Sequence, residues 1–161
     1  MAITNGYATL AEVKGRLGIE VDDAADDTKL ENIVEAVSRW IDKDRRRRFY
    51  SASETRYFTP YHPDHVWVDD LTSVTTLSVA TSTDRTYTAW ATTDYDLLPA
   101  NAALELRPYQ LIEVAPASSR YLVRSLRTSV KIVAVFGYWT SVPEPVNEAC
   151  LLLSERVFKR K

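Results

Sequence analysis

The sequence predicts an α+β protein in which a small helical bundle, made of an N-terminal helical hairpin and a C-terminal helix, carries an inserted antiparallel β-module that is barrel- or sandwich-like. Apolar residues recur at helical spacing in residues 1–50 and again after Ser141. Between these segments the chain has no helical period and is rich in Thr, Val, Tyr and Trp, which favour strands. We therefore expect a helical core at residues 1–50 and 141–161 and a β-module at residues 51–140.

The N-terminal part of the chain contains the signals for two helices. Thr9-Leu-Ala-Glu12 has the capping-box pattern that starts a helix, and Gly18 is suited to end it. After an acidic loop from Glu20 to Asp27, a second capping box at Thr28-Lys-Leu-Glu31 precedes the longest helix, which is expected to run to about Arg47. Its apolar residues recur at helical spacing: Leu30, Ile33, Val34, Val37, Trp40 and Ile41. Two helices joined in this way form a helical hairpin.

The middle of the chain is predicted to form a series of short strands. They are expected near Thr55–Thr59, His65–Val68, Val74–Ala80, Thr86–Ala89, Tyr95–Leu97, Leu104–Leu106, Leu111–Val114, Arg120–Val123 and Val130–Gly137. Turns at Pro60–Pro63 and Pro99–Asn101 interrupt the series. Several short strands in succession favour a small antiparallel barrel or sandwich.

The end of the chain changes from strand to helix. Lys131 is the single charge in the last strand, so we expect that strand to be covered on both faces. Ser141-Val-Pro-Glu144 has the capping-box pattern, and Pro143 and Pro145 suit a first helical turn. We expect one face of this helix, Val146, Cys150, Leu153 and Val157, to pack against Leu30, Ile33, Val37 and Ile41.

Composition limits the classes of function. A chain of 161 residues is one domain, or one domain with an insertion, and its net charge of -2 provides no overall attraction to nucleic acid. Cys150 is the single cysteine, so no disulfide within the chain and no cysteine-based zinc site is expected. Neither a signal-peptide pattern nor a membrane-spanning apolar run is present. These features predict a soluble protein made in a cytosol, with no membrane partner.

The motifs of common enzymes are missing from the sequence. It has no glycine-rich phosphate loop and no Gly-x-Ser-x-Gly elbow, and we expect neither catalysis nor a cofactor. The paired acids Asp69–Asp70 and Asp94/Asp96 are interpreted as charges at strand ends, because neighbours in a strand point in opposite directions. His62 and His65 flank Pro63-Asp64, which offers fewer ligands than zinc sites use, and a surface turn without metal is expected. A metal bound there would revive an enzymatic interpretation.

Two basic segments and four tryptophans are candidate contact residues. The basic ones are Arg45, Arg46, Arg47 and Arg48 at the end of the second helix and Lys159, Arg160 and Lys161 at the end of the chain. They either complement helix dipoles, with the arginines also pairing with acids around Asp22 to Asp27, or contact phosphates or an acidic neighbouring subunit. The tryptophans Trp40, Trp67, Trp90 and Trp139 either anchor the β-core or an interface or stack on bases.

Two stretches of the chain resemble the head–tail connector (adaptor, or head-completion) family of long-tailed bacteriophages. The first combines Ala8–Ile19 with the acidic loop and Asp27–Ile41, and the second combines Phe136-Gly-Tyr-Trp with Val142–Leu153. The resemblance implies a structural virion protein of the neck that forms a ring, usually of twelve copies, beneath the portal. It also implies that the ring continues the DNA channel, touches genomic DNA without sequence specificity, and docks a tail-side neck or terminator protein.

The long β-region departs from the short loop of minimal family members. Under the implied function, Arg45–Arg48 or Lys159–Lys161 lie near the lumen or the portal. Two alternatives stay open. One is a tail-completion or terminator ring protein, and the other is a stand-alone nucleic-acid-binding module, which the arginines and aromatic residues suggest.

Overall fold

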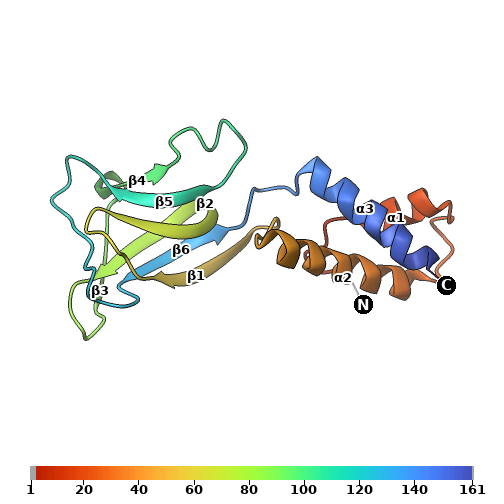
Figure 1. Ribbon diagram of the computed structural model, residues 1–161, viewed down its shortest axis with the longest axis horizontal. Helices are drawn as coiled ribbons and strands as arrows, with labels where there is room; N and C mark the ends of the chain where they lie inside the picture. The colour runs from red at the N-terminus through yellow and green to blue at the C-terminus, as the bar shows by residue number, and fades with distance from the viewer. Residues whose placement is uncertain (1–2, 161) are drawn as a thin grey trace. The chain divides into compact units, whose positions relative to one another are not determined.

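The computed structural model describes residues 3–160, and the chain divides into two compact units. The helical unit consists of the segments up to Tyr50 and from Ser141 onward, and the β unit is Ser51–Thr140. The described residues form three α-helices, which lie toward the two ends of the chain, and a six-stranded antiparallel sheet between them (Figure 1). The predicted α+β class is therefore confirmed. None of the helices within residues 3–160 combines the length and apolar character that a bilayer span requires.

The first helix, α1 (Leu10–Leu17), begins and ends as predicted. The backbone N–H of Glu12 donates to the hydroxyl of Thr9 at 3.2 Å, and the Glu12 carboxylate accepts the N–H of Thr9 at 2.6 Å. Gly18 ends the helix with φ of +70°, a left-handed conformation that glycine adopts without a steric cost.

The starts of the other two helices differ from the predictions. Helix α2 (Asp27–Arg45) already includes Thr28, so the capping box at Thr28–Glu31 is wrong; Asp26 is the cap and makes no side-chain cap bond. Helix α3 (Glu144–Lys159) has Pro143 as its cap, with φ of -61° and ψ of 140°. The capping box at Ser141–Glu144 is therefore also wrong, because the extended proline places the first turn beyond the reach of the Ser141 hydroxyl.

The core of the helical unit joins all three helices. Its buried side chains are Tyr7, Ala8, Val13, Leu30, Val34, Val37, Ile41, Cys150 and Leu151. Of the face predicted for α3, Cys150 is fully buried, Val146 and Leu153 are half-buried, and Val157 is 46% exposed. The predicted face was wrong at Val157, because α3 packs between α1 and α2 and turns Leu151 inward instead.

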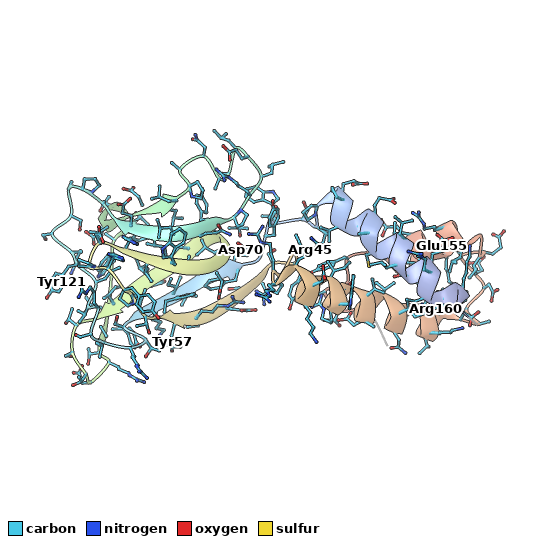
Figure 2. The ribbon with its side chains drawn as sticks, in the orientation of Figure 1. Arg45, Tyr57, Asp70, Tyr121, Glu155 and Arg160 are labelled. Atoms are coloured by element: carbon cyan, nitrogen blue, oxygen red, sulfur yellow. The ribbon has the colours of Figure 1, made fainter. Side chains whose placement is uncertain are left out.

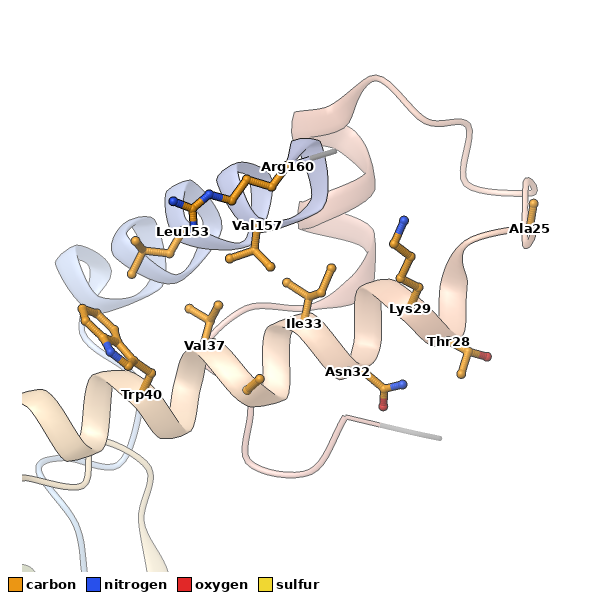
Figure 3. Close-up of a pocket in the computed structure, with 11 residues that line it drawn as sticks. Ala25, Thr28, Lys29, Asn32, Ile33, Val37, Trp40, Leu153, Val157 and Arg160 are labelled. Atoms are coloured by element: carbon orange, nitrogen blue, oxygen red, sulfur yellow. The ribbon is translucent and has the colours of Figure 1, made fainter.

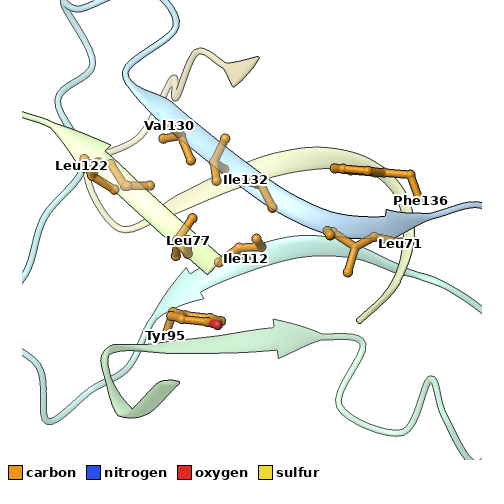
Figure 4. Packing of buried hydrophobic residues seen from close by; sticks show 11 residues of the cluster. Leu71, Leu77, Tyr95, Ile112, Leu122, Val130, Ile132 and Phe136 are labelled. Atoms are coloured by element: carbon orange, nitrogen blue, oxygen red, sulfur yellow. The ribbon is translucent and has the colours of Figure 1, made fainter. Parts of the chain in front are cut away.

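The β unit is one antiparallel sheet with the strand order β1-β6-β2-β5-β4, and β3 pairs with the far end of β2. The strands are β1 (Ala52–Phe58), β2 (His65–Ala80), β3 (Tyr87–Ala89), β4 (Tyr95–Leu98), β5 (Tyr109–Val114) and β6 (Val130–Phe136). The first part of β2 pairs with β5 and the rest pairs with β6, and the register shifts three times along these two ladders. Such irregularities bend a strand, so the sheet curls around one core (Figures 1 and 4).

Three predictions within the β unit were wrong. The strands expected at His65–Val68 and Val74–Ala80 are one continuous strand, so Asp69–Asp70 lie inside it and not at a strand end. They are accommodated at the bulged part of β2, where Arg56 donates to Asp69 at 2.7 Å. The strands expected at Leu104–Leu106 and Arg120–Val123 are absent from the described chain, where these residues form turns and irregular loops.

One face of the sheet packs onto a buried core. Figure 4 shows Leu77, Ile112 and Ile132 meeting in this core, and β6 alternates fully buried residues with half-buried ones. The expectation that β6 is covered on both faces therefore holds fully for one face and partly for the other. Residues of the opposite face, such as Trp67, stay exposed to solvent.

Candidate assembly surfaces

The arginine run lies where α2 ends and the chain reverses. Arg45 is the last helical residue, with a 70% exposed side chain whose Nε lies 3.0 Å from the Asp44 carboxylate. Arg46 has φ of +52°, and its N–H donates back to the carbonyl of Asp42. The helix therefore ends two residues before the expected Arg47, and the four guanidinium groups do not cover the faces of a helix.

A buried tyrosine shapes this turn. The hydroxyl of Tyr7 donates to the carboxylate of Asp42 and accepts the backbone N–H of Phe49 at 2.9 Å. Burial and then the hydrogen bond to Asp42 raise the pKa of the Tyr7 phenol, which keeps it a donor. The guanidinium groups of Arg39 and Arg48 lie 4.7 and 4.6 Å from the ring of Tyr50. Sequence reasoning missed Tyr7, because it precedes the first helix and belongs to no periodic pattern.

The acidic loop at residues 20–27 is at the opposite end of α2. A helix of 19 residues spans about 28 Å, so Arg45 is too far from this loop to pair with it. The loop is instead held by Lys14, whose side chain is 2% exposed and forms an ion pair with Asp27. The Lys14 ammonium group also donates to the carbonyls of Val21 and Asp23, at 3.0 and 2.8 Å. The loop is thus presented in a defined conformation.

The basic end of α3 is partly engaged within the helical unit. Lys159 donates to Glu155 at 2.7 Å, one helical turn back, and Arg16 of α1 donates to Glu155 and Glu148 at 2.9 and 3.0 Å. Hydrogen bonds from Lys159 and then Arg16 lower the pKa of Glu155. Arg160 is exposed, and Lys161 lies outside the described residues (Figure 2).

An open apolar groove runs between α2 and α3. Its volume is about 980 Å³. Figure 3 shows Ile33 and Val37 of α2 facing Leu153 and Val157 of α3, with Trp40 at one end. A second hollow of about 690 Å³ shares Trp40 and Leu153. Basic side chains line both hollows, Lys29 and Arg160 in the first and Arg45 and Arg156 in the second.

The four tryptophans have different environments. Trp40 is 55% exposed at the groove, and Trp67 is 65% exposed on the outer face of β2. Trp67 lies opposite Leu111 of β5, so two apolar side chains are neighbours on the outer face of the sheet. Trp90 is half-buried and packs against the sheet core, and Trp139 is half-buried. As interface anchors, Trp40 and Trp67 are therefore the accessible candidates.

The clustered side chains of the β1–β2 loop are the remaining candidate site. His62, Asp64 and His65 present ligand atoms that all lie within 4.8 Å of one another. Sequence reasoning identified these residues as a surface turn and did not foresee that the two imidazoles stack. Asp94, by contrast, has a structural role, because it accepts the N–H of Ala91 at 3.0 Å and the hydroxyl of Ser118 at 3.0 Å.

Exposed apolar grooves of this size are typical of proteins that assemble with other chains. The nature of the assembly follows from the family comparison, in which the model of the phage gp6-like head-tail connector proteins matches residues 7–106. The chain belongs to this family, and the resemblance found in the sequence is confirmed. It is therefore a structural protein of the virion, placed at the head–tail junction in the neck.

A solved structure supports the same fold over the whole chain. A chain of the structure described as "Neck of empty GTA particle computed with C6 symmetry" superposes with a TM-score of 0.65 at 20% identity. The similarity covers 100% of this chain and 82% of that chain, so it includes β5, β6 and α3, which lie beyond the family match. No curated protein matches.

Proposed function

We propose that this connector forms a closed ring between the portal and the tail, and that the ring continues the DNA channel. The groove between α2 and α3 is the observation that carries the proposal, because an isolated chain leaves Trp40 and Val157 half-exposed there. Membership of the head–tail connector family supports a ring, for which we expect twelve copies. The solved neck chain was obtained with C6 symmetry, with which rings of six or twelve copies are compatible.

The occupant of the groove is the acidic loop of a second copy. In this loop Val21 is 70% exposed and stands between Glu20 and Asp22. Its apolar side chain suits the groove, and its acidic neighbours suit the basic residues beside it, such as Arg160. Groove and loop are different surfaces of one chain, so the contact is heterologous, and a heterologous contact forms a ring when the rotation between successive copies closes.

The decisive test combines the protein with its portal. We expect native mass spectrometry to show a multimeric ring with the wild-type chain and to show monomers after Trp40→Glu and Val157→Glu. Leu104→Glu is the matched control, since Leu104 is 85% exposed and lies in the other unit. Monomers of the wild type in the presence of the portal would overturn the ring, and wild-type ring formation by the groove variant would overturn the interface.

The exposed ends of the basic segments contact the portal or the passing DNA. Arg45, Arg46 and Lys159 are exposed and are not assigned to the acidic loop of the next copy, and contacts to phosphates carry no sequence information. Arg45→Gln with Arg46→Gln leaves the packing of Arg48 on Tyr50 in place. We expect this variant to reduce the yield of assembled particles or the fraction of particles that retain DNA. If both are unchanged, these arginines do not contact the portal or the DNA.

The accessible arginines also support the second candidate, a stand-alone nucleic-acid-binding module. That function predicts DNA binding by the isolated chain that weakens steeply as salt rises. The connector proposal instead expects contact with DNA only within the assembled ring. A gel-shift or fluorescence titration of the isolated chain at low salt separates them, since absence of binding there excludes the stand-alone module.

A further inference from the structure

The loop between β1 and β2 gathers both histidines of the chain beside a carboxylate. The imidazole rings of His62 and His65 are stacked, with centroids 4.4 Å apart and planes inclined by 15°. Nδ1 of His65 lies 3.0 Å from Oδ1 of Asp64. The ligand atoms of the three residues all lie within 4.8 Å of one another. From this arrangement we propose that the loop binds a divalent transition-metal ion of the zinc type.

Backbone hydrogen bonds from two other segments of the β unit hold the main chain of the loop in place. The N–H of Val114, at the end of β5, donates to the carbonyl of Asp64 at 2.6 Å, and the N–H of Leu122 donates to the carbonyl of Pro63 at 2.7 Å. Pro63 restricts its own φ. His65 is already the first residue of β2. Because the main chain is fixed at these points, the ligand side chains close onto an ion by rotation alone.

The distances suit a small ion. Zinc holds imidazole nitrogens and carboxylate oxygens at about 2.0–2.2 Å, so the cluster needs to contract only modestly around it. Two nitrogen donors and an oxygen donor favour zinc over magnesium or calcium, which prefer oxygen ligands throughout. Nδ1 of His65 and Oδ1 of Asp64 already lie 3.0 Å apart, which is close to the spacing of two ligands on one zinc ion. An ion bound here therefore replaces the hydrogen bond between them and takes both atoms as ligands.

The sheet supplies a fourth ligand. Glu113 of β5 is the register partner of His65, and both side chains belong to the outer face because their neighbours Ile112 and Val66 are buried. Residues directly opposite on antiparallel strands have Cβ atoms about 4.5–5.5 Å apart. The exposed Glu113 carboxylate lies outside the cluster of ligand atoms within 4.8 Å, and a rotation of its side chain brings it toward the imidazole of His65. With His62, Asp64 and His65 it completes the four-ligand set typical of zinc.

The next carboxylate along the same row provides a matched control. Asp96 of β4 is the register partner of Glu113, one strand farther from His65. Adjacent strands are about 4.8 Å apart, so Asp96 is roughly twice as far from His65 as Glu113 is. Removing the Glu113 charge should weaken the site, and removing the Asp96 charge should not. This pair separates coordination from a general attraction between a cation and acidic residues.

The test is a titration of the full chain, without a polyhistidine tag, with Zn²⁺ by isothermal calorimetry. We expect one Zn²⁺ per chain, and at least about a 10-fold weaker affinity after His62→Gln, His65→Gln, Asp64→Asn or Glu113→Gln. Asp96→Asn and an excess of Mg²⁺ should leave the affinity unchanged. Zinc should also raise the thermal midpoint of the wild type but not of the double histidine variant.

The coordination itself is checked by X-ray absorption, which should show nitrogen and oxygen ligands and no sulfur. Cys150, the single cysteine, is buried in the helical unit and is not part of the set. Absence of saturable Zn²⁺ binding overturns the proposal, and so does wild-type affinity in the folded double histidine variant. Wild-type affinity after Glu113→Gln overturns the assignment of the fourth ligand.

Discussion

The ammonium group of Lys14 in α1 forms an ion pair with the carboxylate of Asp27 at the first residue of α2, although Lys14 is 2% exposed. Two backbone carbonyls of the intervening loop accept its other hydrogen bonds. A buried cation is tolerated when its charge and its donors are all matched in this way. Lys14 thereby connects the helical core to the loop that we propose as the ring contact.

Replacement of Lys14 by Met should remove this connection. We expect the free energy of unfolding of the helical unit to fall by about 3 kcal/mol, because the carboxylate and both carbonyls lose their partner. Urea unfolding followed by circular dichroism measures the change. Lys43→Met is the control, since Lys43 is exposed on α2 and its loss should cost about 0.5 kcal/mol or less. Equal effects of the two changes would contradict the structural role of Lys14.

The phenol of Tyr7 predicts a pH dependence. Its pKa in the folded chain is raised above the ordinary value of 10.0, by burial first and by the bond to Asp42 second. Its contribution to stability is therefore fully present below pH 10 and is lost as the pH rises through the folded pKa. Tyr7→Phe should lower the free energy of unfolding by about 1–2 kcal/mol at pH 7.

The measurement is urea unfolding of the wild type and of Tyr7→Phe between pH 7 and pH 11. The difference between the two should shrink at the alkaline end, since the unfolded wild type gains stability by ionising its phenol first. Tyr57→Phe, at a side chain that is 51% exposed, controls for loss of a hydroxyl. A difference that stays constant across this range would show that the Tyr7 pKa is not raised by folding.

The contacts between α1 and α3 predict that stability falls at acid pH, whereas Tyr7 predicts a fall at alkaline pH. Hydrogen bonds from Lys159 and Arg16 lower the pKa of Glu155 below its ordinary value of 4.5. The carboxylate therefore contributes stability above that value, and the contribution is lost as the pH falls through the folded pKa. We expect Arg16→Gln to reduce the drop in thermal midpoint between pH 7 and pH 3.

Salt offers an independent check on this pair, because Arg16 and Glu155 lie near the surface. Raising the ionic strength should bring the thermal midpoint of the wild type toward that of Arg16→Gln at pH 7. Lys43→Gln, on the exposed side of α2, is the matched control for loss of a positive charge. If Arg16→Gln left the drop in thermal midpoint between pH 7 and pH 3 unchanged, that drop would come from other carboxylates.

Charge reversal tests the orientation of copies in the ring. Glu20→Lys with Asp22→Lys should abolish ring formation with the portal, because the loop would then meet the basic residues of the next groove. Lys29→Glu with Arg160→Glu, the two basic residues that line the groove, should do the same alone and should restore rings when combined with the first pair. Native mass spectrometry reads out the copy number, and failure of the combination to restore rings would contradict the loop-to-groove contact.

Sequence-based predictions were accurate where the interactions are between near neighbours in the chain, and less accurate where they depend on packing between distant segments. The start of α1 at Thr9 and its end at Gly18 were predicted correctly, since both depend on bonds within a few residues. The caps expected at Thr28 and Ser141 were not, because the same local pattern allows more than one first turn. Val157 was placed in the core by its spacing, and the packing of α3 between two helices turns it toward the groove.

The candidate sites show the same division. The arginine run and the exposed tryptophans could be identified from the sequence, and their roles stay predictions. The sequence by itself determined the three helices, the α+β class and the family resemblance, since these rest on periodicity and local motifs. Only the tertiary structure decided that Lys14 is buried, that a groove lies open beside Trp40, and that Glu113 stands opposite His65. Each of these depends on residues that are distant in the chain and meet only when helices pack and strands pair.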